Sequence, residues 1–140
     1  MEISARVSNT AGGHAADVAT AGSRQSVAVA AKAQAQGRGS AINGGEFLML
    51  ALATCYCNDV YREAARRGLQ VERVEVDVEG EFGGEGEPAR NVTYRVRAAA
   101  QGSEAELREL LHHTDRVAEI QNTLRAGVPV TLAEVKVEGA

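Results

Sequence analysis

The sequence predicts an α+β fold that forms a single domain over residues 1–140. Apolar residues alternate with charged ones over residues 74–82 and 92–98, a pattern typical of strands with one buried face. A long helix is predicted over residues 46–67, because this stretch has no glycine or proline and Gly68 follows it where a left-handed residue ends many helices. The length suits one domain with a sizeable core.

The segment before the long helix predicts strands followed by a loop. Short alternating pieces at residues 3–7 and 27–29 are separated by glycine-containing turns, as in a β-meander. Residues 34–45 contain four glycines and show no periodicity. We therefore expect a loop that leads into the helix.

The two alternating strands are expected to form a hairpin, because the turn-rich segment 83–90 joins them. The outer face of the first strand is acidic and that of the second is basic, so cross-strand ion pairs are expected to fix the pairing. A final strand is predicted over residues 130–137.

A second helical region follows the hairpin. Ser103 and Glu106 form an S-x-x-E capping box at its start, and Gly127 with Pro129 closes it. A break is possible near residues 114–115.

Composition indicates which partners and compartments to expect. The chain has 15 Lys and Arg against 19 Asp and Glu, a formal net charge of −4, and no basic cluster, so we expect neither nucleic acid nor a membrane as a partner. The longest apolar stretch, residues 47–53, is far shorter than the roughly 20 residues that cross a bilayer. Residues 1–8 lack the apolar core of a signal peptide, and two cysteines are too few for a disulfide scaffold. These features favour a cytoplasmic protein.

The predicted helix is apolar all the way round in its amino-terminal half. Placed at 100° steps, one face is apolar from end to end and is expected to lie against the sheet: Leu50, Ala53, Cys57, Val60, Tyr61 and Ala64. The other face becomes polar only from Asp59 onward. Because such a helix must be covered on both sides, we predict a homodimer packed around these helices. The alternative is that the second helical region of the same chain covers the second face.

Cys55 and Cys57 point about 160° apart on a helix, so they cannot form a disulfide while the helix is intact. Cys57 is expected to face the sheet as a small buried apolar residue. Cys55 lies where the other face changes from apolar to charged, with Asp59 one turn on and Arg62 two turns on. Cys55 is therefore the candidate reactive residue.

Residues 43–55 read NGGEFLMLALATC, which resembles the N-P-x-E-L-L-L-A-A-L-A-x-C signature of the OsmC/Ohr family, the osmotically inducible and organic hydroperoxide resistance proteins. The runs Arg66-Arg67-Gly68-Leu69, Asn122-Thr123-Leu124 and Gly127-Val128-Pro129-Val130 match in the expected order, so the resemblance spans about residues 37–137. It implies an OsmC-like fold, in which antiparallel sheets wrap around a long central helix and two chains form an intertwined homodimer.

The resemblance also implies thiol chemistry. In family peroxidases a cysteine thiolate attacks the O–O bond of a hydroperoxide, becomes a sulfenic acid and is captured by a second cysteine. Cys55 matches the attacking cysteine. Because it is distant from the amino terminus of its own helix, we expect a cation to lower its pKa. The family supplies an arginine from the loops before the helix; Arg24 is the better match and Arg38 the alternative.

Two departures from the family pattern affect this assignment. The partner carboxylate of the best-known peroxidases lies ten residues before the cysteine, where this chain has Gly45; Glu46 is displaced by about 100°. Glu46 is the candidate carboxylate, or only a first-turn helix residue. The run that holds the second cysteine reads AEIQNTL here, over residues 118–124. The resolving cysteine is absent, so turnover would need an external thiol or Cys55 of a second subunit.

The function predicted from the sequence is reduction of a small-molecule organic hydroperoxide by Cys55 and an external thiol reductant, with no cofactor and no metal. His112 and His113 are adjacent and point in different directions, which does not form a metal-ligand pattern. The alternative is a non-catalytic dimeric module that binds a small apolar or thiol-reactive ligand. A hot-dog thioesterase dependent on Glu46 or Asp59 is a third hypothesis, against which the motif around Cys55 speaks.

Overall fold

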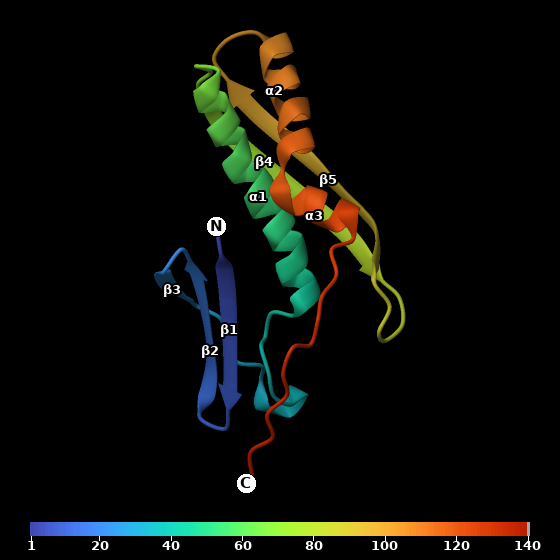
Figure 1. The fold of residues 1–140 in the computed structure, drawn as a ribbon. Coiled ribbons are helices and arrows are strands. Elements are labelled where there is room, and N and C mark those ends of the chain that lie inside the picture. Colours follow the sequence, from blue (N-terminus) through green and yellow to red (C-terminus); the bar gives the residue numbers. More distant parts are fainter. Residues whose placement is uncertain (140) are drawn as a thin grey trace. The chain divides into compact units, whose positions relative to one another are not determined.

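The computed structural model describes residues 1–139, and over this range the chain is α+β, with two separate antiparallel sheets (Figure 1). Contacts group it into two compact units, residues 1–48 and a second unit that begins at Met49. Helix α1 (Gly44–Arg66) runs through this boundary. The expected antiparallel sheets are confirmed, with one sheet in each unit.

The first unit is the predicted meander. Its strands are β1 (Ile3–Thr10), β2 (Gly13–Thr20) and β3 (Ser23–Val27), paired antiparallel in the order β1-β2-β3. A short 3₁₀ turn, η1 (Gln34–Gln36), interrupts the loop that precedes α1. None of the side chains described in residues 1–48 is buried. The sheet therefore has no core of its own.

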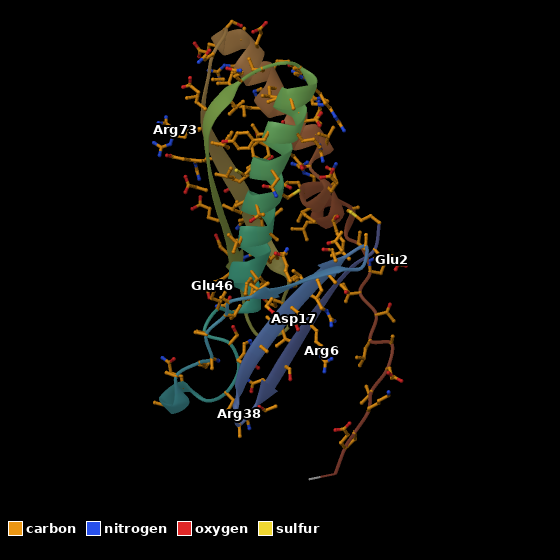
Figure 2. All side chains as sticks on the ribbon, turned by 90° about the vertical axis from the view of Figure 1, so that its left-hand side faces the viewer. Glu2, Arg6, Asp17, Arg38, Glu46 and Arg73 are labelled. Carbon is orange, nitrogen blue, oxygen red and sulfur yellow. The ribbon has the colours of Figure 1, made fainter. Side chains whose placement is uncertain are left out.

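Helix α1 begins with a reciprocal cap. The Asn43 N–H donates to Glu46 Oε1 at 3.0 Å, and the Glu46 N–H donates to Asn43 Oδ1 at 2.8 Å. This is the capping-box arrangement, with asparagine in place of serine or threonine. Figure 2 shows Glu46 in the first turn of the helix. At the other end, Gly68 has a φ of +65°, as predicted for the residue that stops the helix.

The second unit contains the predicted hairpin and two further helices. Its elements are β4 (Val71–Phe82), β5 (Ala89–Ala100), α2 (Glu104–Val117) and α3 (Glu119–Ala126). The outer faces of the strands pair as expected: Arg95 lies 2.9 Å from Glu79 and Arg90 lies 3.4 Å from Glu81, and Arg97 pairs with Glu75.

The second helical region breaks later than predicted. Ser103 Oγ accepts the Glu106 N–H at 3.1 Å, which confirms the capping box, and Gly127 ends α3 in a left-handed conformation. The break, however, falls at Ala118, which is extended and separates α2 from α3. Residues 114–115 remain helical, and the buried Thr114 hydroxyl is satisfied within the same helix by donating to the Leu110 carbonyl at 2.8 Å.

The core lies where α1 and α2 pack side by side against the β4–β5 hairpin (Figure 1). Tyr56, Val60 and Ala64 of α1 meet Leu110 of α2, and all four are buried. The Tyr56 hydroxyl donates to the Leu111 carbonyl at 2.8 Å, and the Tyr56 ring packs edge-on to Tyr94 with centroids 5.0 Å apart.

The predicted sheet face of α1 is only partly right. Val60 and Ala64 are buried, but Leu50 is 55% exposed and Tyr61 44% exposed. The buried line of α1 instead runs through Leu52 and Tyr56. The buried side of α1 differs from the predicted one because α2 and the β4–β5 hairpin both cover the helix. The most buried residues of α1 therefore point toward the space between α2 and the hairpin. The second helical region thus covers part of the helix, while Leu50 and Tyr61 stay uncovered.

The strand predicted over residues 130–137 is absent from the described structure. This segment has no regular secondary structure, and Val130 is 97% and Val137 90% exposed. A strand exists only when its backbone groups bond to a neighbouring strand, and no such neighbour lies among residues 1–139. Among the described helices, none has the length and apolar character that a membrane span requires.

Candidate functional site

Cys55 lies on α1 where the first residues of α3 approach the helix. Its side chain is half-buried. The Sγ atom is 3.5 Å from Asp59 Oδ2, one turn further along α1, and 3.7 Å from Glu119 Oε2 at the start of α3. The thiol can donate its proton to either carboxylate. The site therefore combines one sulfur with two acidic groups from two helices of the second unit.

The surroundings of Cys55 act on its pKa in opposite directions. Burial raises the pKa of the thiol most strongly, and the Ile120 backbone N–H, in the first turn of α3, lowers it. Asp59 and Glu119 raise it further, and the net result is a pKa above the usual value. The amino terminus of α3 thus favours the thiolate, while burial and the carboxylates favour the thiol.

The two carboxylates are coupled to each other. Asp59 is buried, and burial, together with Glu119, raises its pKa to about 6. The pKa of Glu119 is lowered, first by a hydrogen bond from Asp59 and also by Arg62. When the pair holds one proton, that proton therefore stays on Asp59.

Arg62 neutralises the carboxylates rather than the sulfur. Its Nη1 atom lies 3.1 Å from Asp59 Oδ1 and 2.8 Å from Glu119 Oε1. The cation expected to lower the pKa of Cys55 is therefore not supplied by α1, and the charged groups within hydrogen-bond distance of Sγ are both acidic.

Three possible metal-ligand atoms meet at this point. The sulfur of Cys55 and one oxygen each of Asp59 and Glu119 lie within 4.8 Å of one another. The guanidinium of Arg62 already pairs with both carboxylates, and its positive charge opposes a second cation. The donor set does not favour a metal, and we propose none.

The other predicted site residues belong to the first unit. Glu46 caps α1 through Oε1. Arg24 lies on β3 opposite Ala19 and is exposed, and Arg38 lies in the loop before α1. Their relation to Cys55 stays a prediction.

Glu119 and Ile120 are site residues that the sequence pattern alone did not predict. The signal that points to them is their place in the run 118–124, which corresponds to the family segment that carries the second cysteine. A segment whose cysteine reacts with a sulfenate on the first cysteine must lie close to it. Ala118 replaces that cysteine and is fully buried.

Cys57 points away from this site. It lines a shallow hollow of about 290 Å³ together with Ala53, Thr54, Asn58 and Val76 of β4. The prediction that Cys57 faces the sheet is therefore right in direction, although its side chain is half-buried rather than fully buried.

Glu63 is the centre of an ionic cluster next to the Cys55 site, and this cluster links α1 to α2. Its carboxylate accepts hydrogen bonds at 2.9 Å from Arg62 Nε and from Arg66 Nη1, and the His113 Nε2 atom of α2 lies at the same distance. The bond from Arg62 contributes most to lowering the pKa of Glu63 below its usual value of 4.5.

We expect Glu63→Gln to destabilise the protein at pH 7 and to flatten its acid response. Because the folded-state pKa of Glu63 is lowered, its contribution is complete above the unfolded value of 4.5 and is lost as the pH falls through the lower folded value. The difference in melting temperature between wild type and variant should shrink as the pH falls below 4.5. Glu109→Gln, an exposed carboxylate paired with Arg116, is the control; an equal pH response in both variants would contradict this assignment.

Comparison with known proteins identifies the family of this chain and structures with a similar fold. The family model described as OsmC-like protein matches residues 37–133. A search with the sequence finds no matching curated protein.

Three solved structures are similar in fold. An OsmC-like protein from Mycoplasma pneumoniae is 15% identical, with a TM-score of 0.62 over 90% of this chain and 87% of that chain. An OsmC-like protein of unknown function from Vibrio cholerae is 18% identical, with a TM-score of 0.59 over 88% and 93%. An organic hydroperoxide resistance protein OsmC from Legionella pneumophila is 17% identical, with a TM-score of 0.56 over 89% and 90%. With the family model matching more than half of its length, this chain belongs to the OsmC-like protein family.

Proposed function

We propose that this OsmC-like chain reduces organic hydroperoxides, with Cys55 as the reacting residue and an external thiol as reductant. The observation that carries the proposal is the position of the Cys55 sulfur at the start of α3, 3.5 Å from Asp59 Oδ2, a carboxylate oxygen that can take its proton. The Ile120 backbone N–H acts in the same direction, because it lowers the pKa of the thiol. Family membership and the fold similarity to a hydroperoxide resistance protein support it.

In the first half of the reaction, Asp59 Oδ2 accepts the thiol proton as the Cys55 thiolate forms. The sulfur attacks the outer peroxide oxygen, so that an S–O bond forms and the O–O bond breaks. Asp59 returns its proton to the departing alkoxide. The products are an alcohol and the sulfenic acid of Cys55.

In the second half, one external thiol attacks the sulfenic sulfur, which gives a mixed disulfide and water. A second external thiol releases the disulfide of the two reductant molecules and restores the Cys55 thiol. The external thiol is required because Ala118 stands where the family's second cysteine would be. We place the protein in the cytoplasm, where such thiols are abundant.

The roles of Arg24 and Glu46 belong to the same proposal. Arg24 supplies the cation that stabilises the thiolate, and Glu46 orients Arg24. The capping hydrogen bond of Glu46 uses Oε1, which leaves Oε2 available. Arg38 is the alternative cation.

The proposed assembly is a homodimer. Leu50 and Tyr61 leave one side of α1 uncovered, the described residues of the first unit bury no side chain, and the apolar residues of segment 130–137 are exposed without a strand partner. A second copy supplies apolar surface to all of these. Sedimentation should give twice the 14.7 kDa of one chain; a stable monomer at micromolar concentration would contradict the dimer.

Peroxide-dependent consumption of an external monothiol tests the activity. With cumene hydroperoxide, we expect wild type and Cys57→Ala to consume the thiol at similar rates, and Cys55→Ala to fall to the uncatalysed rate. Equal consumption by wild type and Cys55→Ala would exclude the reductase.

A second candidate function is a non-catalytic module that binds a small apolar or thiol-reactive ligand. The raised pKa of Cys55 favours it, because a protonated thiol reacts slowly. Mass spectrometry after peroxide treatment with dimedone separates the two. Selective labelling of Cys55 supports the reductase, whereas an inert Cys55 supports the binding module.

A further inference from the structure

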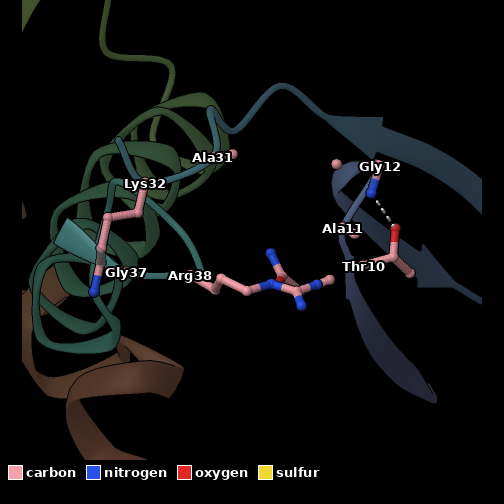
Figure 3. Close-up of a pocket in the computed structure, with 10 residues that line it drawn as sticks. Thr10, Ala11, Gly12, Ala31, Lys32, Gly37 and Arg38 are labelled. Atoms are coloured by element: carbon pink, nitrogen blue, oxygen red, sulfur yellow. Dashed lines mark hydrogen bonds between the residues drawn. The ribbon is translucent and has the colours of Figure 1, made fainter. Parts of the chain in front are cut away.

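A cavity of about 340 Å³ lies within residues 1–48, between the turn that joins β1 to β2 and the loop before α1 (Figure 3). Its size falls within the range of small-molecule sites. The lining residues that matter here are Thr10, Gly12, Lys32, Gly37, Arg38 and Gly39. The cavity is separate from the Cys55 site, which the second unit forms.

The charges of this cavity are all of one sign. Lys32 and Arg38 are its charged lining residues, and no carboxylate lines it. Over residues 1–139, neither cation makes an ion pair. In a chain with a net charge of −4, two uncompensated cations at one cavity produce a local positive potential.

Arg38 is directed at the opposite wall. Figure 3 shows its side chain extending from the loop toward the turn at Thr10 and Gly12. On that wall, Thr10 Oγ1 accepts the Gly12 N–H at 3.2 Å, which leaves the hydroxyl proton of Thr10 free to donate. A guanidinium and a hydroxyl donor thus line the same space.

The loop keeps the space beside Arg38 open. Gly37 and Gly39, on either side of it, have φ values of +99° and +112°, a region that side chains rarely adopt. A Cβ added to either glycine would meet nothing within 4 Å. The backbone on both sides of Arg38 is therefore accessible from the cavity.

We propose that this cavity is a binding site for a small dianionic oxyanion of the phosphate type. Arg38 binds two of its oxygens with its planar guanidinium, and Thr10 donates its hydroxyl proton. Lys32, whose side chain runs along the loop away from the Arg38 guanidinium in Figure 3, adds positive charge at longer range. A dianion matches the two cations better than a carboxylate does. The site uses neither Cys55, the carboxylates around it nor Arg24, the cation that the proposed reductase takes first, so binding of the oxyanion does not depend on that activity.

Titration of the full-length protein with inorganic phosphate, phenyl phosphate or acetate, followed by amide NMR spectra, tests the proposal. We expect saturable shifts at Gly12, Gly37 and Gly39 with both phosphates and weaker binding of acetate. Phenyl phosphate binding more tightly than inorganic phosphate identifies a phosphate ester as the ligand; the reverse identifies free phosphate.

Arg38→Gln should weaken phosphate binding about tenfold or more, and Lys32→Gln should weaken it as well. Arg24→Gln removes an arginine of the same unit that does not line the cavity, and it should bind like wild type. Unsaturable shifts, equal affinity for acetate, or equal losses in Arg24→Gln and Arg38→Gln would overturn the site. Retained wild-type amide spectra in Arg38→Gln show that a loss of binding is not a loss of fold.

Discussion

Glu119→Gln is expected to speed the alkylation of Cys55 at pH 7 about three- to tenfold, because it lowers the pKa of the thiol. Glu119 Oε2 lies 3.7 Å from the sulfur, and its charge raises the pKa of Cys55. The lowered pKa of Glu119 means that this carboxylate is ionised throughout the neutral range. Replacing it with an amide removes that charge and keeps the size of the side chain.

The measurement is the rate of reaction with iodoacetamide as a function of pH, in a Cys57→Ser background so that one thiol reacts. The rate should reach half its maximum at a lower pH in Glu119→Gln than in the parent. Glu104→Gln, also in the first turn of a helix and exposed, is the matched control and should leave the profile unchanged. If Glu119→Gln behaves like this control, the carboxylate does not set the thiol pKa.

Leu110→Ala is expected to lower the free energy of unfolding by about 2–5 kcal/mol. Leu110 is fully buried and joins α2 to Val60 and Ala64 of α1, so its loss leaves a cavity at the centre of the core. Urea unfolding at one fixed protein concentration measures the change, because dimerisation would make stability depend on concentration.

Leu124→Ala supplies the comparison for this experiment. Leu124 is 42% exposed, so the same substitution should cost about 1 kcal/mol or less. Equal losses in the two variants would mean that the contact between α1 and α2 is not the core of the second unit.

Features encoded by neighbouring residues were predicted correctly. Helix α1 and its end at Gly68, the hairpin with its charged faces, and the Ser103 cap all depend on contacts between residues close in sequence or directly paired across one turn. Their patterns are therefore readable in the chain itself.

Features that need a partner element were predicted less well. The predicted buried face of α1 was wrong in part, because packing against α2 buries a different side of the helix. The break after α2 lies at Ala118 rather than near residues 114–115. The strand predicted over residues 130–137 has the right alternation but no neighbour within the described chain. Alternation encodes a preference for pairing and not the identity of the pair.

The same distinction between local features and features that need a partner element applies to the candidate site. The sequence by itself determined that Cys55 and Cys57 point to opposite sides of one helix, that Asp59 and Arg62 follow Cys55 on its face, and that the resolving cysteine is missing. Only the tertiary structure decided that α3 places Glu119 beside the sulfur, where the Ile120 N–H also acts on the thiol pKa. It also decided that Arg62 forms ion pairs with both carboxylates, Asp59 and Glu119. A pKa depends on charges and burial within a few ångströms, and residues separated by 64 positions meet there through packing alone.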